Sequence, residues 1–386
     1  MTLAAVGANS SLAYVLEQKD DAAKYGVTPT TPTMKYMRAK IGSKFELKRS
    51  TFQSKEMSAN RQIMGLGYGN RDGSGDIPFE LSYGSFDDFL EAVMGGTWAV
   101  NVLKIGNSKR SFTFEQGYPD INIFEQNLGV VMTGFSLSVK PNAIVEGSFT
   151  HMFKDQQSVQ TGYDATATGA LAFTATTITR TSGSFLTDGF AAGDVVSIKG
   201  ATTSANNINA TIVSVVALTM TFGAATFTLD ATNQTGLSLA KICAATTTAV
   251  NSNTVFDSFT GSLTEGGATL AIVTGIDLKL DQSASVSNVL FDPTVQQVSL
   301  AVVNVTGTLV VRFVNNALKK KFLAGTASDI SFLLGGASKA YRFDMSAVKY
   351  TAATTDSAET ELTMTLPFQA VYDATDASSL MITRIP

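Results

Sequence analysis

A glycine string is the first stretch of the sequence whose residue types could do chemistry. The segment GLGYGNRDG, from Gly65, contains G-x-G-x-G. A dinucleotide site needs such a string between a strand and the N-terminus of a helix. Alternating apolar residues after Gly75 predict a strand here instead. We therefore interpret the string as a long, glycine-rich loop between two strands, with no nucleotide site.

Acidic residues form the second group of candidates. Asp72 and Asp76 flank glycines, but the oxygen-ligand spacing of an EF-hand is absent, which favours a plain turn. Asp87 and Asp88 would serve a glycosidase only if they faced each other across a sugar-binding cleft. At the start of a helix they interact favourably with the helix dipole instead.

The single histidine and the single cysteine complete the candidates. His151 lies in the strand-like segment EGSFTHMF, near Phe149 and Phe153, with no nucleophile beside it, which favours a buried structural histidine. Cys243 is best explained as a small buried apolar residue. One residue of each kind excludes an intrachain disulfide and sites rich in cysteine or histidine. The sequence thus predicts no catalytic, cofactor-binding or metal-binding residue, and no enzyme.

The elements that must position these residues are organised around residues 74–98. Phe79 and Leu81 alternate with polar residues and predict a strand with one apolar face. Ser85 stands where the N-cap of a following helix is expected, and Gly95 ends that helix. Neither element can bury its apolar face alone, so further strands are required.

The same pattern occurs again late in the chain. Leu309 and Val311 alternate in a predicted strand, Asn315 or Asn316 can cap a helix, and Gly325 ends it. The flanking segments repeat in the same order: FELKRSTF from Phe45 with IDLKLDQS from Ile276, FTFEQGYPD from Phe112 with YRFDMSAVKY from Tyr341, and EGSFTHMF from Glu146 with ELTMTLPFQAVYD from Glu361. We infer two divergent copies of one module.

These patterns predict a mainly β fold. It contains two β-sandwich or barrel modules, each with one short helix, separated by a small inserted all-β domain. The expected boundaries are 1–40 for an N-terminal extended arm, 41–157 for module one, 158–253 for the insert and 254–386 for module two.

Two of these segments allow more than one interpretation. Residues 1–40 contain TPTTPT, which cannot be helical, and we expect them to pack on a neighbouring subunit; a floppy tail is the alternative. The insert is rich in alanine and threonine and nearly free of charge. Its alternating Val, Ile and Phe favour short strands that decorate a surface, over a disordered linker.

Composition excludes several classes of protein. The chain of 386 residues is 44% hydrophobic and 16% charged, which supports several folded domains with partly covered surfaces. A net charge of −4 provides no basic footprint for gripping nucleic acid. The sequence shows neither a signal peptide nor an apolar run of about 18 residues, so we expect no membrane association and synthesis in the cytoplasm.

The two predicted helices carry opposite charges. The first carries Asp87, Asp88 and Glu91, and the second carries Lys319, Lys320 and Lys321. If the modules lie side by side in a ring, acidic and basic helices alternate and can pair at each junction. These six residues are our candidates for contacts between modules; the alternative is two ordinary solvated helix faces.

The chain resembles the major tail tube proteins of bacteriophages with long, flexible, non-contractile tails (siphoviruses). The resemblance rests on LAYVLEQ, YGVTPTTP, SKEMSANRQI from Ser54, GNRDGSGDIPFELSYGSFDDFLEAVMGGTW from Gly69 and RSFTFEQGYPD from Arg110. The insert segment SGSFLTDGFAAGDVVSIKG, from Ser182, resembles a β-domain often found in such proteins. Most of the resemblance lies in module one. Module two is included because it repeats the pattern of module one.

The resemblance implies a structural protein of the virion whose rings stack into a hollow tube that delivers phage DNA. Two modules in one chain imply a trimer that acts as a pseudo-hexamer. The implied partners are further copies of the chain, the tape measure, tail terminator and distal tail proteins, and DNA that passes without sequence-specific binding. The sequence predicts no cofactor.

The candidate surfaces of such a tube follow from alternation along the strands. If Leu47, Phe79, Leu81, Ile276, Leu278, Leu309 and Val311 face the core, the alternate residues face the lumen. The lumen-facing candidates are Glu46, Lys48, Glu80, Asp277, Lys279, Asp281 and Arg312. The expected loop near Gly65 supplies the ring-stacking candidates, which are Leu66, Tyr68, Asn70, Arg71 and Asp72.

Two functions from other classes remain open at this stage. A virion-surface or cell-surface adhesin would use the inserted domain to bind a glycan or receptor. A carboxylate-based hydrolase is the third. Electron microscopy of concentrated protein separates them, because only the first function predicts tubes.

Overall fold

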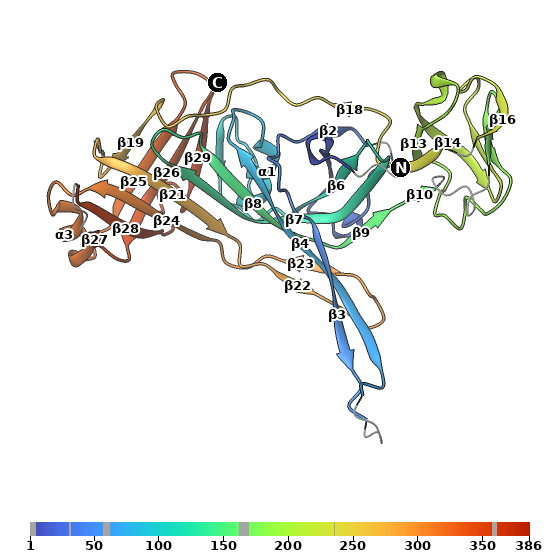
Figure 1. Ribbon diagram of the computed structural model, residues 1–386. Coiled ribbons are helices and arrows are strands. Elements are labelled where there is room, and N and C mark those ends of the chain that lie inside the picture. Colours follow the sequence, from blue (N-terminus) through green and yellow to red (C-terminus); the bar gives the residue numbers. More distant parts are fainter. Residues whose placement is uncertain (1–4, 31, 57–61, 162–169, 235, 357–360) are drawn as a thin grey trace.

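The computed structural model describes the chain except for residues 1–4, 31, 57–61, 162–169, 235 and 357–360. The described residues form two α-helices and three sheets, so the fold is mainly β, as predicted. The largest sheet has 19 strands and runs through both modules (Figure 1). The second has eight strands and forms the insert, and the third is a two-stranded hairpin.

Module one is built on six long strands. They are β1 (Ser11–Lys19), β3 (Glu46–Gln53), β4 (Leu66–Glu80), β6 (Arg110–Tyr118), β7 (Ile123–Val139) and β8 (Glu146–Phe153). They pair antiparallel in the order β1, β6, β7, β8, β4, β3. The shorter strands are β2 (Met34–Tyr36), β5 (Val102–Lys104) and β9 (Asp155–Ser158).

Module two repeats this topology. Its main strands are β19 (Gly261–Glu265), β21 (Val273–Asp281), β24 (Asn304–Arg312), β25 (Ser328–Leu334), β26 (Ala340–Tyr350) and β28 (Thr363–Ala370). They pair in the order β19, β25, β26, β28, β24, β21, which is the order of module one. The additional strands are β20 (Ala268–Thr269), β22 (Ser285–Ser287), β23 (Gln297–Ser299), β27 (Thr354–Asp356) and β29 (Met381–Ile385).

The predicted duplication is confirmed, with one error in the matching of segments. YRFDMSAVKY forms β26, which takes the place of β7 between its neighbours. The sequence pattern matches it with FTFEQGYPD, which forms β6 and corresponds to β25. Both segments alternate in the same way, so periodicity could not tell two adjacent strands apart.

A buried carboxylate occurs at the same place in both modules. Glu17 on β1 accepts a hydrogen bond from Ser111 Oγ at 2.7 Å, on the paired strand β6. Glu265 on β19 accepts one from Ser328 Oγ at 2.7 Å, on the paired strand β25. Buried charges require hydrogen-bond partners. Both modules therefore have a buried glutamate that is bonded to a serine on the paired strand, although their sequences have diverged.

The modules join by direct strand pairing. Residues 134–139 of β7 pair antiparallel with residues 276–281 of β21, from Gly134 opposite Asp281 to Val139 opposite Ile276. The N-terminal half of β7 pairs instead with β6 and β9. The long strand β7 therefore links the outer strands of module one to a sheet that continues into module two.

The core of module one is a cluster of aromatic rings around helix α1 (Asp87–Met94). The ring centroid of Phe79 lies 4.6 Å from that of Phe86 and 4.6 Å from that of Phe149, and all three are fully buried. Phe89 on α1 lies 4.5 Å from Tyr14 on β1. The predicted apolar face of the helix is thus packed between strands from both ends of the module.

The two helix ends test the predicted caps. Phe86 occupies the N-cap of α1 without a side-chain hydrogen bond, so the prediction of Ser85 as the cap is wrong. The Ser85 hydroxyl instead shares a hydrogen bond with that of Ser82. Gly95 ends the helix in the left-handed conformation, with φ of 59°, as predicted.

Helix α3 (Ala317–Ala324) packs less closely against the rest of the protein than α1 does. The side-chain oxygen of Asn315 accepts the N–H of Ala317 at 2.9 Å, and Gly325 ends the helix with φ of 63°, as predicted. Of its residues only Leu318 is buried, whereas α1 buries five. The helix therefore lies at the outer side of module two (Figure 1).

The expected N-terminal arm is a strand of module one. β1 pairs with β6 along its length and with β2, and Leu12 and Tyr14 are buried in the core. Leu12 and Tyr14 therefore pack within their own chain, where β1 covers the edge of β6. Packing of the rest of residues 1–40 on a neighbouring subunit stays a prediction.

The expected loop near Gly65 is also a strand. Leu66–Glu80 forms β4, which pairs with β3 in a hairpin that projects away from the modules (Figure 1). A Cβ atom on Gly67 would lie 2.1 Å from the Phe52 ring, and one on Gly73 would lie 2.4 Å from the Phe153 ring. The glycines make room for rings on paired strands, so they are not turn signals.

The insert is a separate unit with its own core. Its strands are β10 (Gln160–Thr161), β11 (Leu171–Phe173), β12 (Thr177–Arg180), β13 (Val195–Lys199), β14 (Asn209–Val216), β15 (Thr219–Phe222), β16 (Asp230–Gln234) and β17 (Ser238–Ile242). Phe173, Phe185 and Ile198 are among its fully buried residues. The chain then returns along module one, where β18 (Thr247–Thr248) pairs parallel with β2. The described residues also form three short 3-10 helices, which are η1 (Gly7–Asn9), η2 (Ala22–Lys24) and η3 (Ser204–Asn206).

Asn122 clamps the insert to module one. It is fully buried in the turn between β6 and β7, in a left-handed conformation with φ of 52°. Its side-chain N–H group donates to Ser197 O at 3.1 Å on β13 and to Ser238 O at 3.2 Å on β17. Gln160 Nε2 donates back to Asn122 O at 3.0 Å. Buried hydrogen bonds thus fix the insert relative to module one.

His151 on β8 is buried among aromatic rings. Its ring centroid lies 4.4 Å from that of Phe45 and 6.0 Å from that of Phe153. Neither ring nitrogen has a hydrogen-bond partner among the described residues. Burial lowers the pKa of His151 from its ordinary value of 6.5 to about 3, so the imidazole is neutral and structural.

This burial predicts acid sensitivity of the soluble subunit. Below about pH 6.5 His151 binds a proton in the unfolded chain but stays neutral in the folded chain until its pKa of about 3 is reached. The free energy of unfolding therefore falls as the pH falls from about 6.5 towards 3. Between pH 7 and about pH 4.5 the wild type should lose about 2 to 3 kcal/mol more than His151→Phe, as measured by urea unfolding. Equal losses in the two proteins would contradict the prediction.

Candidate assembly surfaces

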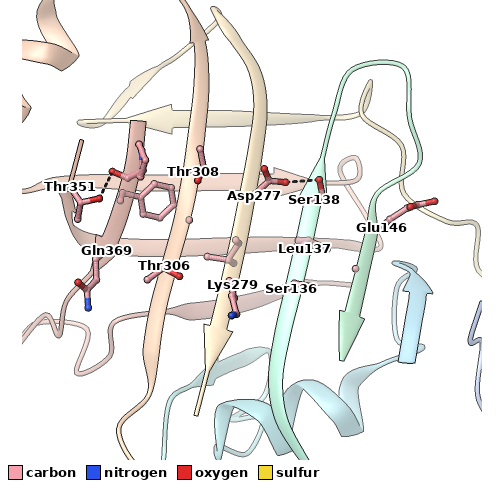
Figure 2. A pocket seen from close by; sticks show the side chains of 15 residues that line it. Ser136, Leu137, Ser138, Glu146, Asp277, Lys279, Thr306, Thr308, Thr351 and Gln369 are labelled. Atoms are coloured by element: carbon pink, nitrogen blue, oxygen red, sulfur yellow. Dashed lines mark hydrogen bonds between the residues drawn. The ribbon is translucent and has the colours of Figure 1, made fainter. Parts of the chain in front are cut away.

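One face of the continuous sheet is polar. An open groove of about 650 Å³ crosses β8, β7, β21, β24 and β28 (Figure 2). Its lining includes Ser136, Ser138, Glu146, Asp277, Lys279, Thr306, Thr308, Thr351 and Gln369. Ser138 Oγ donates to Asp277 Oδ1 at 2.5 Å across the junction of the modules. The lumen-facing candidates Asp277 and Lys279 therefore lie together on this face.

The opposite face of the sheet is the core. Ile276, Leu278 and Leu280 on β21 are buried, as are Leu309 and Val311 on β24. In module one Phe79 and Leu81 are fully buried and Leu47 packs on the core partly buried. The predicted core-facing set is confirmed; that the alternate residues face a lumen stays a prediction.

Charges on the polar side occur as neighbours of opposite sign. Lys48 lies 3.2 Å from Glu46, Lys279 lies 3.6 Å from Asp281, and Arg312 lies 3.2 Å from Glu361. Lys40 contacts Glu146 and lies 3.9 Å from Glu80. Such exposed pairs stabilise the fold little, but they cancel charge locally.

The acidic residues of α1 are used within the chain. Asp87 accepts hydrogen bonds from the Tyr341 hydroxyl and from Arg384 Nη1, the latter at 2.7 Å; both partners belong to module two. Asp88 accepts from Lys35 Nζ at 3.0 Å and from the Tyr14 hydroxyl at 2.9 Å. Burial, assisted by these carboxylates, raises the pKa of Tyr14 and Tyr341, so both hydroxyls remain donors.

Arg384 completes the contact between the modules. Its guanidinium lies 4.2 Å from the centre of the Trp98 ring, and Nη2 donates to Val100 O at 2.7 Å. Glu91 is 3.0 Å from Arg110 Nη2 and accepts the backbone N–H of Trp98 at 2.7 Å. The acidic helix is therefore tied to module two at one end and to its own module at the other.

The lysines of α3 do not meet α1 in the same chain. Lys321 Nζ lies 2.8 Å from the buried carboxylate of Glu265, within module two. Lys319 and Lys320 are exposed. Pairing of the acidic and basic helices thus stays a prediction for contacts between chains.

The ring-stacking candidates divide into two groups along β4. Leu66 and Tyr68 are exposed near the end of the hairpin, and Arg49 lies 4.5 Å from the centre of the Tyr68 ring. Asn70 and Arg71 lie nearer the base. Their bonds lead into module two: Asn70 Nδ2 donates to Asp292 O at 2.9 Å, and the Arg71 N–H donates to Pro293 O at 2.8 Å. Asp72 pairs with Lys48 in the strand register.

The residues first considered for chemistry are separated by the fold. Cys243 is buried and its N–H contacts Glu115, whose pKa is raised by burial. Within the described part of the chain, no group of three or more His, Cys, Asp or Glu residues could hold a metal ion. What the geometry provides is a set of surfaces: a polar sheet face, free sheet edges and projecting hairpins.

Comparison with known families adds one finding to this geometry. The sequence model of the family described as phage tail tube protein matches the chain twice, over residues 7–213 and 176–370. The chain belongs to the phage tail tube protein family. The two matches each end or begin within the insert, so the family pattern repeats along with the topology. None of the curated proteins matches the chain.

Membership of the tail tube family identifies the chain as a structural component of the phage tail. None of the helices in the described residues is long and apolar enough to cross a membrane.

Two features of this tail tube protein escaped the sequence reasoning. One is Arg384, because nothing in the sequence near it points to Asp87. The other is the β22–β23 hairpin of module two, which carries the exposed residues Val289, Leu290 and Phe291. The apolar run VLF before Asp292 and Pro293 was an available signal for an apolar turn.

The Arg384 network predicts how the two tail tube modules hold together. Replacing Arg384 with Ala removes the partner of half-buried Asp87 and the cation over Trp98, and should lower the free energy of unfolding by about 2 kcal/mol. Urea unfolding of the soluble subunit measures the loss. Arg384→Lys retains the charge but not the planar stacking on Trp98. Its free energy of unfolding should therefore lie between those of the wild type and Arg384→Ala. Wild-type stability in Arg384→Ala would contradict this account.

Proposed function

We propose that three copies of this chain close into a pseudo-hexameric ring, and that the rings stack into the hollow tail tube through which phage DNA reaches the host. The pairing of β7 with β21 is the observation that carries the proposal. It shows one module joined to the next by continuation of a sheet. If the same strand pairing is repeated between chains, the continuous sheet closes into a barrel.

The free edges of the sheet support closure between chains. β3 pairs only with β4, so its other edge has no strand partner in the described chain. At the other end β26 continues into β27, which among the described residues pairs only with β28. These are the counterparts of β21 and of the C-terminal half of β7. Exposed edges of this kind promote pairing with another chain.

An exposed apolar side chain marks one of these edges. Ile41 precedes β3, beside the backbone contacts of Lys40 with Pro78 and of Lys44 with Asp76, and is 84% exposed. On the corresponding strand β21, Ile276 pairs in register with Val139 of module one, so that edge is covered within the chain. Coverage by a neighbouring chain accounts for both the free edge and the exposed isoleucine.

The polar face of the sheet suits the lumen of such a tube. Ser, Thr and Gln side chains with locally paired charges line it. DNA is held by dense basic stripes or by aromatic stacking platforms. A surface of the observed composition lets DNA pass without gripping it, with Asp277 and Lys279 among the groups it meets.

The proposed partners follow from this role. The tube ends contact the tail terminator and the distal tail protein, and the tape measure protein occupies the lumen during assembly. The chain is made in the cytoplasm of the host bacterium and functions in the virion of a long, non-contractile tail.

The insert offers a second, additional role in adhesion. It has a separate core, lies at the side of module one away from module two (Figure 1), and exposes Leu186, Val216 and Leu218. On a tube it would form an outer decoration able to bind a cell surface. Loss of cell binding without loss of tubes after deletion of the insert would support this role.

Ile41→Asp tests closure of the ring. A carboxylate at the proposed edge between chains costs desolvation when it is buried, so rings should be lost while the soluble subunit stays folded. Negative-stain electron microscopy and sedimentation measure rings and tubes. The matched control is Val302→Asp, because Val302 is 72% exposed in module two. Rings from Ile41→Asp at the wild-type concentration would exclude this edge.

Leu66→Thr with Tyr68→Thr tests stacking by the β3–β4 hairpin. Threonine keeps the strand propensity but removes exposed apolar surface, so rings should form and fail to polymerise. Deleting residues 66–70 should have the same effect. Because the two substitutions leave the hairpin intact, the same result from them would show that the deletion does not act by damaging the hairpin. Normal tubes from the double variant would refute the assignment of these residues.

A further inference from the structure

Phe291 has no role in folding that accounts for its position. It is fully exposed, at 103% of the reference surface, at the tip of the β22–β23 hairpin. Its backbone is in the left-handed conformation, with φ of 68°, which bulky residues avoid and Gly or Asn tolerate. Neither burial nor local conformation favours phenylalanine here. Such strain often coincides with functional contacts.

Val289, Leu290 and Phe291 form an exposed apolar knob. Their side chains are 51%, 84% and 103% exposed. The knob is held in place by the adjoining residues: Asp292 O and Pro293 O accept the bonds from Asn70 and Arg71 described above. A knob that is fixed in advance loses little conformational freedom when it binds.

An apolar cleft lies at the opposite end of the same strand. The knob follows the C-terminal end of β21, whereas a cleft of about 460 Å³ surrounds its N-terminal end. The apolar lining includes Val139, Phe259, Leu263, Leu270, Ile276 and Leu334. Phe259 is 76% exposed there. A cleft of this volume has room for an aromatic side chain from another chain.

Asp292 beside the knob and Lys140 at the rim of the cleft carry opposite charges. Hydrogen bonds from Thr294 lower the pKa of Asp292, so the carboxylate next to the knob is ionised. Exposed Lys140 lies at the rim of the cleft and takes part in none of the ion pairs of the described residues. The other rim charge, Asp257, already accepts the N–H groups of Phe259 and Thr260.

We propose that the knob of one copy docks in the cleft of a second copy of this chain in the adjacent ring. Because knob and cleft lie beyond opposite ends of β21, displacement along the strand brings them together. The contact is heterologous and does not close, so it repeats from ring to ring. This inference rests on the proposed tube and adds a module-two contact to the β3–β4 hairpin.

Phe291→Asn separates assembly from stability. Asparagine suits the left-handed backbone, so the soluble subunit should have the same or a higher unfolding midpoint. Loss of a central aromatic anchor should raise the concentration needed for polymerisation by about tenfold or more. Light scattering measures polymerisation. The matched control is Val100→Asn, because Val100 is 87% exposed with φ of 57° and lies outside the knob; its polymerisation should be unchanged.

Disulfide trapping tests the partner directly. In a Cys243→Ala background, Phe291→Cys with Phe259→Cys should give a covalent ladder on non-reducing gels, and neither single variant should. Suppose that the wild type forms tubes, but that Phe291→Asn polymerises normally or the double-cysteine chain gives no ladder. Docking of the knob in the cleft would then be overturned, while the proposed tube would stand. A wild-type chain that stays monomeric at all concentrations would overturn the proposed function as well.

Discussion

Backbone pairing between β7 and β21 is the interaction on which the rest of the molecule depends. Buried N–H and C=O groups need partners, and a sheet edge that ends within a structure leaves them unpaired. Here module two supplies the partner for the edge of module one, in register over residues 134–139 and 276–281. The apolar alternation then places one face of the continuous sheet on the core and leaves the other polar.

The side-chain contacts at the junction support this pairing without replacing it. Asp87 and Arg384 join α1 to the last strand of module two, and Trp98 covers the guanidinium. Helix α3, at the corresponding place in module two, has exposed lysines and buries little. The two copies share a topology, but their helices make different contacts.

Local patterns predicted what depends on local physics. Alternation placed Ile276, Leu278 and Leu309 in the core, and glycine ended both helices, because burial and helix termination act over a few residues. Two of the errors concern partners distant in sequence. The glycines of β4 resembled a loop because the Phe52 and Phe153 rings that need their space lie on other strands. β1 resembled an arm because its partner β6 comes much later. No local signal links Asp87 to Arg384.

The buried clamp at Asn122 determines how the exterior of an assembly is organised. Because Asn122 and Gln160 hold the insert at one angle, every copy presents the same outer surface in the same orientation. A long filament built from such copies would display identical sites at regular spacing. Binding partners with several arms would then engage many weak sites at once, through a high effective concentration. A domain that binds too weakly to detect as a single copy could in this way hold an entire particle to a surface.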